Sequence, residues 1–232
     1  MKKENCAFRG HLGLGDNIIQ QGIVNIFHGM FDTFYVLCKR HNKTSVQYMN
    51  KDLANVVVVS VRGDKHADQW IRRFDGEKMV CGRTGKGWKY ERKGFDTVFY
   101  KQMGLDISDA FNWEVQDGDQ GETILKELHP QRDFCFVHDD HSRGMHINIR
   151  KARAAGIVPN TGLPIVRNRI KSQTVFDYLP LLREAKEIHC MDSSFALMID
   201  RSDITAENLF IHRKVRAAGA IPTYQKKWNI IK

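Results

Sequence analysis

The sequence predicts an α/β fold arranged as two halves, and three observations support this prediction. Apolar runs of strand length alternate with segments of helical spacing through the first half of the chain. The same alternation starts again near residue 133. Between the two series, residues 117–121 (DGDQG) are the clearest break in composition in the 232-residue chain. We therefore expect one α/β domain over residues 1–118 and a second over residues 119–232.

The elements of the first half follow from local patterns. Residues 5–12 are typical of a strand that enters a glycine turn, and residues 17–30 place apolar side chains on one face of a helix. Asp16 stands where the N-cap of that helix is expected. The valine run at 55–61 predicts a parallel strand covered on both faces. The remaining expected elements are strands at 33–38 and 78–81 and helices at 43–53, 64–74 and 95–105.

The second half repeats this rhythm after a short helical piece at 121–129, which Pro130 ends. Apolar runs at 133–138 (DFCFVH) and 187–191 (EIHCM) are its clearest strand candidates. Residues 224–231 either pack back onto the core or contact a partner, and the sequence leaves both readings open. The other expected elements are strands at 163–166 and 209–212 and helices at 175–185 and 193–199.

The composition of the chain indicates which general class of protein it belongs to. The chain is 42% hydrophobic and 27% charged, as is usual for a globular protein in water. The five cysteines are scattered without a C-x-x-C pair, which excludes a clustered zinc site and predicts free thiols in a reducing compartment. No apolar run approaches the roughly 18–20 residues that span a bilayer, and residues 1–9 lack the apolar stretch of a signal peptide. We therefore expect a cytoplasmic protein with no transmembrane segment.

The net charge of +9 is compatible with two kinds of anionic ligand, a nucleic acid or a nucleotide diphosphate. The excess is spread over both halves, which argues against a dedicated basic domain. The densest basic stretch, residues 83–93 with Trp88 and Tyr90 inside it, is either a nucleic-acid surface or a solvated loop with two anchoring aromatics. A nucleotide diphosphate in a mildly positive cleft also agrees with this charge.

Two glycine-rich segments fail the familiar phosphate-binding patterns. The turn at Gly13 and Gly15 has Ile18 where the dinucleotide fingerprint requires a third glycine. It still lies between a strand and a helix, where close backbone approach and free amides favour an anion or a sugar. The segment at 82–87 (GRTGKG) has Val80 and Gly87 where a P-loop requires glycine and Ser or Thr. The sequence contains neither G-x-S-x-G nor H-E-x-x-H, so hydrolase and zincin readings gain no support.

Polar residues follow two strands of the second half. The stretch from His138 to His141 (HDDH) is either a divalent-metal site or a polar loop at the carboxyl end of the sheet. Arg143 in the same loop has the fork geometry that grips phosphate oxygens. Asp192, Ser193 and Ser194 join a strand to a helix, as a phosphate cradle or as an ordinary N-cap. A cleft between two such halves is a common ligand site.

Two of these segments carry a family resemblance. The stretch from His11 to Ile19 (HLGLGDNII), followed by Gly22, resembles the first strand, turn and helix of glycosyltransferases with the GT-B fold. The heptosyltransferase-like branch and related small viral or bacterial sugar transferases open in this way. Residues 178–197 (YLPLLREAKEIHCMDSSFAL) resemble the donor-site segment of the same enzymes, in which a D-S/T-S/G turn leads into a helix beneath the nucleotide-sugar.

The resemblance implies two Rossmann-like domains facing each other across a cleft, with the acceptor on the first and the nucleotide-sugar on the second. It implies a transferase that moves a sugar from a nucleotide-diphosphate sugar to a glycan or other hydroxyl acceptor, with no cofactor beyond that co-substrate. Asp16 matches the position of a general base in such transferases, and His11 is the rival base. Gly13, Gly15 and Asn17 are the expected substrate contacts beside them.

On the donor side, Arg143 resembles the basic residue that neutralises the diphosphate, and Ser193 and Ser194 would donate to its oxygens. Fixed donors and cations stabilise a departing diphosphate without a metal, so no metal ligand is predicted. The sequence departs from the family pattern in its Asp-Ser-Ser turn, in Leu197 where a histidine is usual, and in its short length. The predicted donor-site residues are His138, Arg143, His189, Asp192, Ser193 and Ser194.

Two other functions compete with this reading. A basic accessory protein would bind nucleic acid through residues 83–93, with binding that weakens steeply as salt rises. A non-catalytic α/β module would bind a sugar or nucleotide without transferring it. The sequence leaves open the donor, the acceptor, the anomeric outcome and the oligomeric state.

Overall fold

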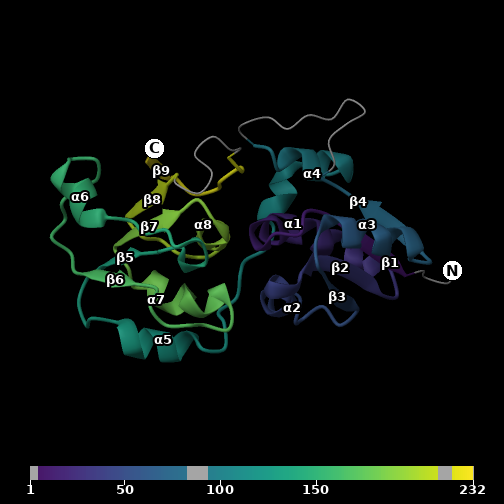
Figure 1. Cartoon of the computed structure of the whole chain (residues 1–232), viewed down its shortest axis with the longest axis horizontal. Helices are drawn as coiled ribbons and strands as arrows, with labels where there is room; N and C mark the ends of the chain where they lie inside the picture. The colour runs from purple at the N-terminus through teal and green to yellow at the C-terminus, as the bar shows by residue number, and fades with distance from the viewer. Residues whose placement is uncertain (1–4, 83–93, 214–220, 232) are drawn as a thin grey trace. The chain divides into compact units, whose positions relative to one another are not determined.

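The computed structural model describes residues 5–82, 94–213 and 221–231. The chain forms two compact units, Met1–Glu114 with Ala220–Thr223 and Val115–Gly219 with Tyr224–Lys232. The chain passes from the first unit to the second a few residues before the predicted boundary at 118, and its final segment contributes to both units. Each unit contains a parallel sheet with helices on its faces (Figure 1), so the predicted α/β class is confirmed.

The first unit is built on a four-stranded parallel sheet with the order β3-β2-β1-β4. Its strands are β1 (Cys6–Arg9), β2 (Phe34–Lys39), β3 (Val56–Val61) and β4 (Glu77–Val80), and its α-helices are α1 (Leu14–Phe27), α2 (Lys43–Met49), α3 (Asp64–Arg73) and α4 (Thr97–Gln102). Every strand and most helices expected from the sequence are present, although the helix predicted at 43–53 ends at Met49.

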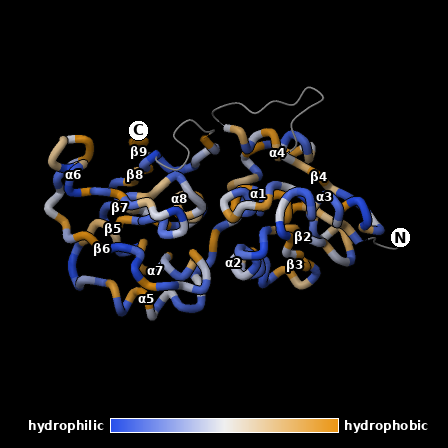
Figure 2. The backbone as a smooth tube through the Cα atoms, viewed as in Figure 1, coloured by the Kyte–Doolittle hydropathy of each residue, from blue (hydrophilic) through white to orange (hydrophobic). Residues whose placement is uncertain are grey.

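The two faces of this sheet are covered by different helices. Helix α3 packs on β1 and β3, where its Ala67 and Ile71 join Ala7, Leu37 and Val61 in one apolar cluster. The rest of α3 is hydrophilic and blue in Figure 2. Helices α1 and α2 contact each other, and right-handed crossovers place them on the opposite face. Strand β1 therefore lies in the buried middle of the sheet.

Two sequence predictions in this unit are wrong. The valine strand β3 is not covered on both faces, because it forms the edge of the sheet and leaves Val57 43% exposed. Asp16 is not the N-cap of α1, because the helix begins earlier than the apolar pattern indicates. Gly13 is the N-cap, and Asp16 lies in the first turn. The Asp16 carboxylate therefore lies close to Gly13, in the turn that precedes it in the sequence.

The second unit has a five-stranded parallel sheet with the order β6-β5-β7-β8-β9. Its strands are β5 (Cys135–Val137), β6 (Ile165–Arg167), β7 (Glu187–Met191), β8 (Asn208–His212) and β9 (Asn229–Ile231), and its α-helices are α5 (Gly121–Leu128), α6 (Ile149–Ala154), α7 (Leu179–Arg183) and α8 (Ser194–Asp200). A 3₁₀ turn, Val175–Tyr178, leads into α7, so the helix predicted at 175–185 is present in two parts.

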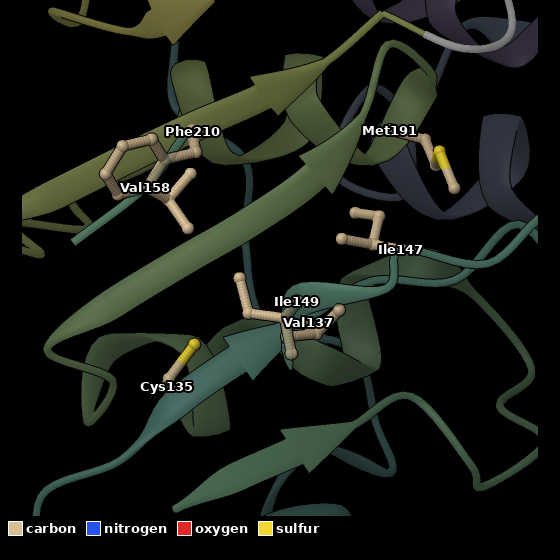
Figure 3. Packing of buried hydrophobic residues seen from close by; sticks show 7 residues of the cluster. All are labelled: Cys135, Val137, Ile147, Ile149, Val158, Met191 and Phe210. Atoms are coloured by element: carbon tan, nitrogen blue, oxygen red, sulfur yellow. The ribbon is translucent and has the colours of Figure 1, made fainter. Parts of the chain in front are cut away.

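Alternate residues of the central strands face two separate cores. On one face, Val137, Met191 and Phe210 meet Ile147 and Ile149 from the α6 region, as Figure 3 shows. On the other face, helices α5 and α7 lie side by side, and Phe136 of β5 stacks against Phe195 of α8. Helix α8 therefore begins directly above the carboxyl end of β5 and β7.

The C-terminal segment packs back onto the core, which resolves the alternative left open by the sequence. Strand β9 pairs with β8, and the buried Asp200 of α8 accepts hydrogen bonds from the Gln225 and Lys226 amides and from the Trp228 indole. Neither β9 nor the short helix α6 was predicted, because both lack a clear apolar period.

Three further predictions concern the chain as a whole. The five cysteines are free and buried, as expected from their scatter. Within the described ranges, no helix is long and apolar enough to cross a membrane. The basic stretch at 83–93 lies outside the described residues.

Candidate functional site

The strand order indicates which edge of each sheet is the expected place for a ligand. In the first unit the chain runs outward from β1 to β2 and β3, then returns to place β4 on the other side of β1. In the second unit the chain runs from β5 to β6, then returns to place β7 on the other side of β5. Ligands of open α/β sheets bind beyond the carboxyl ends of the strands at such reversals. The residues that follow β1, β4, β5 and β7 are therefore the candidates.

In the first unit this position holds an imidazole and a carboxylate. His11 follows β1, and its Nε2 lies 2.7 Å from the carbonyl oxygen of Gly82, which follows β4. Because a carbonyl oxygen only accepts, Nε2 carries a proton. The other ring nitrogen, Nδ1, lies 3.7 Å from Oδ1 of Asp16. The ring also packs edge-on against Phe99, with 4.8 Å between centroids. His11 is therefore held on three sides, with Nδ1 directed toward Asp16.

Two glycines make room for this pair. A Cβ on Gly13 would lie 2.6 Å from Oδ2 of Asp16, so the carboxylate folds over the turn. Gly82 has a φ of +75°, and a Cβ there would lie 2.6 Å from the His11 ring. The glycine that opens the failed P-loop pattern thus has a different role, since it lets β4 end against His11.

The remaining predicted residues of this turn support its backbone. Asn17 is buried and donates from Nδ2 to the Gly13 carbonyl at 2.9 Å, and Gly15 lies in the first turn of α1. Gln20, which sequence reasoning missed, is buried beneath Gly10, where any side chain on that glycine would collide with it. The structure therefore brings together all five of the predicted residues of this turn.

Asp16 determines the protonation of His11. Burial lowers the pKa of His11, but the hydrogen bond and charge of Asp16 raise it by more, so the net shift is upward from the ordinary value. The pair can therefore hold a proton on His11 while Asp16 stays available as an acceptor.

In the second unit, His138 and the turn at 192–194 lie side by side. His138 directly follows β5, and its backbone amide donates to the His189 carbonyl of β7 at 2.8 Å. Its ring stacks on Phe195 at 4.2 Å, with 11° between the planes. Phe195 in turn donates its backbone amide to Oγ of Ser193, which caps α8. Two segments far apart in the sequence thus form one surface at the predicted donor position.

His138 differs from His11 in its protonation. It is 8% exposed, and its Nδ1 is buried with no hydrogen-bond partner among the described residues. Burial lowers its pKa to about 4, although Asp140 and Asp139 act in the opposite direction. His138 is therefore a neutral imidazole near pH 7 with one polar atom left to satisfy.

The carboxylates that follow His138 are each occupied by an arginine. Asp139 accepts from Arg167 at 2.5 Å and from the Ile147 amide at 2.9 Å. Asp140 accepts a short hydrogen bond from Arg143. Burial raises the pKa of both aspartates, but these hydrogen bonds and charges lower it by a larger amount. The net pKa of each aspartate is therefore below its ordinary value. The two carboxylates point toward different partners, so this loop does not assemble them as ligands for one metal ion.

Arg143, Asp192 and Ser194 lie at the same edge. The Arg143 side chain is half exposed beyond its contact with Asp140. Asp192 approaches Arg213, with 3.9 Å between Oδ2 and Nε. Ser194 is the first residue of α8 and is partly exposed. These three residues therefore follow β5 and β7 at the carboxyl edge of the sheet.

The prediction that His189 contacts the donor is corrected by its position in the interior. It is fully buried in β7, with Nε2 at 2.8 Å from Oε1 of Glu187 and Nδ1 at 2.9 Å from Nε2 of His212. Because a carboxylate only accepts, His189 donates from Nε2, and its Nδ1 then accepts from His212. A residue in the middle of a strand lies on a face of the sheet and not at its carboxyl end, which explains the error.

His189 also belongs to a group that resembles a metal site in composition. Ligand atoms of Cys135, Glu187 and His189 lie within 4.8 Å of one another, and all three residues are buried. Glu187, however, is ion-paired at 2.8 Å with Arg153, so its carboxylate already has a cationic partner. Burial raises the pKa of Glu187, but hydrogen bonds from His189 and Arg153 lower it to about 2. This group is a hydrogen-bonded core network.

Comparison with known proteins shows the fold alone. No protein-family model matches the sequence, and a search of the curated proteins found no match. Among solved structures, the chain is similar to the crystal structure of the glycosyl transferase family 9 protein from Veillonella parvula. The TM-score is 0.59 at 9% sequence identity, over 100% of this chain and 87% of the other. The chain shares the fold of that glycosyl transferase.

Proposed function

We propose that this protein is a glycosyltransferase that moves a sugar from a nucleotide-diphosphate sugar to an acceptor hydroxyl. The single observation that carries the proposal is the His11–Asp16 pair at the strand reversal between β1 and β4. The fold likeness to a glycosyl transferase family 9 protein supports the class of reaction. The acceptor would bind at the first unit and the donor at the second, in the GT-B-like arrangement that the sequence suggests.

Asp16 is the preferred general base in this proposal. Its carboxylate lies over Gly13 and has one oxygen turned away from His11. His11 is less suited, because Nε2 is committed to Gly82 and the raised pKa favours a proton on Nδ1. His11 would instead hold Asp16 in place and stabilise its charge. A base must reach the acceptor hydroxyl within about 2.6–3.2 Å for this role.

The donor would lie at the edge formed by His138 and the turn at 192–194. Ser193, Ser194 and the first amides of α8 offer hydrogen-bond donors to a diphosphate, and Arg143 offers a positive charge. The unpartnered Nδ1 of His138 can exchange a hydrogen bond with an uncharged part of the nucleotide-sugar. Fixed donors and cations of this kind stabilise the leaving diphosphate, so the proposed mechanism needs no metal.

Of the two alternatives, neither gains a specific observation. The basic stretch on which nucleic-acid binding would depend lies outside the described residues. A non-catalytic module would share the donor site but would not need a carboxylate over the acceptor turn. Transfer assays on Asp16 variants therefore separate a transferase from a binding module.

The first experiment is a thermal-shift screen with UDP, GDP, ADP, CMP and a short oligonucleotide at low and moderate salt. A ligand at 100 times its Kd stabilises the native state by about 2.7 kcal/mol, which raises the Tm by several degrees. We expect one nucleoside diphosphate to give this shift. The double variant Ser193→Ala/Ser194→Ala should lose most of it, while Ser172→Ala in the same unit should keep it.

Two outcomes of these experiments would contradict the proposal. If no nucleotide shifts the Tm and the oligonucleotide does, with the effect lost at moderate salt, the protein binds nucleic acid. If a nucleotide binds but no donor sugar is consumed with any acceptor, the protein is a binding module.

A further inference from the structure

The second unit has a groove that none of the predicted site residues explains. It has a volume of about 480 Å³ and lies where the loops after β5 and β6 meet the start of α6. Pockets of about 300–1,000 Å³ accommodate small-molecule ligands. Its apolar floor comes from Ile147 and Ile165, and its charged lining residues are Asp139, Arg150, Arg167 and Arg169.

A rigid frame holds the inner part of this groove. Arg167 donates to Asp139 and to the Ile147 carbonyl, at 2.5 Å and 3.0 Å. Asn168 exchanges two hydrogen bonds with the Asp139 backbone, at 2.7 Å and 2.9 Å. The loop after β5 is thereby fixed to the end of β6 before any ligand arrives. Binding to such a frame requires little further ordering of the protein.

The groove carries a positive charge that its own carboxylate does not balance. Three arginines line it against a single aspartate, and that aspartate is already paired with Arg167. Arg150 and Arg169 are exposed, and within the described part of the chain neither has a carboxylate partner. A second hollow of about 460 Å³ shares Arg150 and Ile165 with the first and adds Arg153. Arg153 is ion-paired with Glu187, so Arg150 and Arg169 carry the unbalanced positive charge of this surface.

We propose that this groove binds a phosphate group of a small phosphorylated ligand. Guanidinium groups bind phosphate oxygens in a fork and stay charged at any physiological pH. Arg150 and Arg169 would contact the phosphate, while Arg167 keeps its frame and the partly exposed Ile165 contacts the carbon skeleton of the ligand. The groove follows β5 and β6, whereas the predicted donor turn at 192–194 follows β7, so this is a separate set of residues.

This inference goes beyond the proposed glycosyltransferase activity and does not require it. The phosphate has two chemical sources, the diphosphate of a nucleotide or the phosphate of a phosphorylated sugar. Both present the same group to the arginines, and only binding experiments with each compound separate them.

The test is isothermal titration calorimetry of the full chain with inorganic pyrophosphate at low salt. Charge-assisted hydrogen bonds are worth enough that removing both arginines together should weaken binding by about tenfold or more. We therefore expect the double variant Arg150→Gln/Arg169→Gln to bind pyrophosphate at least about tenfold more weakly. Arg167 is left intact, because its loss would also release Asp139.

The matched control is Arg132→Gln/Lys186→Gln, which removes the same two charges from the same unit. Lys186 is exposed and precedes β7. Arg132 is exposed and precedes β5, so it lies toward the opposite edge of the sheet. The loss of both charges should change pyrophosphate affinity by less than about twofold, because neither residue lines the groove. An equal loss in the control and the double variant would mean that only net charge matters, and would overturn the proposal.

Further ligands identify the source of the phosphate. Weaker binding of glucose 1-phosphate in the double variant, with UDP unaffected, assigns the groove to a phosphorylated sugar. The reverse result assigns it to a nucleotide, and both results support the proposal. Absence of pyrophosphate binding to the unmodified protein, or unchanged affinity in the double variant, would overturn it.

The same variants keep this test independent of the proposed function. If Ser193→Ala/Ser194→Ala abolishes pyrophosphate binding and the arginine variant does not, the anion site is the donor turn and the groove proposal fails. If an oligonucleotide binds far more tightly than pyrophosphate through Arg150 and Arg169, the ligand is nucleic acid and the proposal for a small ligand fails.

Discussion

Two histidines occupy equivalent places in the two sheets and yet differ in chemistry. His11 follows β1 and His138 follows β5, and each of these strands lies at the reversal of strand order in its sheet. The His11 side chain is about one-third exposed and faces the Asp16 carboxylate. His138 is buried against Phe195 with an unpartnered Nδ1. The pKa of His11 is raised, whereas that of His138 is lowered to about 4.

The difference shows that a nearby carboxylate does not by itself charge a histidine. Asp139 and Asp140 follow His138 directly, but each is engaged by an arginine, and burial outweighs their remaining effect. His189 gives the same result in the core, since its pKa is lowered by burial despite a hydrogen bond to Glu187. His11 combines partial exposure with a carboxylate not shared with an arginine in any described contact. In the proposed function, this difference assigns proton transfer to the first unit and donor binding to the second.

The largest effect is expected from Asp16→Asn. If Asp16 is the general base, the variant should lose about 10²–10⁴-fold in sugar transfer, the range that general bases contribute. The pKa of His11 should fall below its ordinary value, because burial is then the dominant influence left. Transfer is followed by release of the nucleoside diphosphate, and the pKa by NMR titration of the imidazole.

Asp52→Asn is the matched control, because Asp52 is an exposed aspartate of the same unit. It should leave both transfer and the His11 titration unchanged. Full turnover in Asp16→Asn would remove Asp16 as the base and end the contrast between the two units in proton transfer.

The next effect concerns how much the buried ion pair between Glu187 and Arg153 contributes to the stability of the second unit. Glu187→Gln leaves Arg153 facing a neutral amide, with only 10% of the arginine side chain exposed. Breaking a buried ion pair in this way should lower the free energy of unfolding by about 3–5 kcal/mol. Urea denaturation measures the change, and Glu184→Gln, an exposed site in the same unit, should alter stability by less than about 0.5 kcal/mol.

A loss below about 1 kcal/mol in Glu187→Gln would show that Arg153 finds other acceptors. Its bonds to the Leu163 carbonyl and to Thr161 are the available ones. The core network would then be replaceable.

The sequence predicted the fold better than it predicted the faces of the elements. Alternating apolar runs located eight of the strands, because parallel strands and their crossover helices differ in period. The strand β3 was wrongly predicted to be covered on both faces, because a valine run also occurs in a strand at the edge of a sheet. Helix α6 and strand β9 were missed, because their burial depends on tertiary contacts with Phe210 and Asp200.

The site residues that are close together in the sequence were also predicted better than those that only the fold brings together. The turn from His11 to Asn17 is local in sequence, so the residues predicted there lie together. The catalytic and binding roles given to them stay predictions. Residues joined only by the fold escaped notice, such as Gly82 against His11 and Arg167 against Asp139. The role given to His189 was wrong, because sequence proximity to a turn does not place a mid-strand side chain at the edge of the sheet.

The smallest effect concerns acid stability and compares the two histidines directly. The unfolded chain protonates a histidine near pH 6.5, whereas folded His138 resists protonation down to about 4. The unfolded state therefore takes up this proton first, and the free energy of unfolding should fall by about 3 kcal/mol between pH 6.5 and 4. His11 has the opposite sign, because its raised pKa gives a contribution present below pH 6.5 that is lost as the pH rises through the folded pKa.

His138→Phe isolates this contribution. Phenylalanine keeps the stacking on Phe195 and removes the unpartnered Nδ1, so stability at pH 7 should change by less than about 1.5 kcal/mol. The variant should lose less stability than the original chain when urea unfolding is repeated at pH 4.5. His11→Gln should lose more stability at pH 4.5 than at pH 8, relative to the original chain. Equal acid sensitivity in His138→Phe and the original chain would mean that His138 titrates normally, and the two histidines would then differ only in exposure.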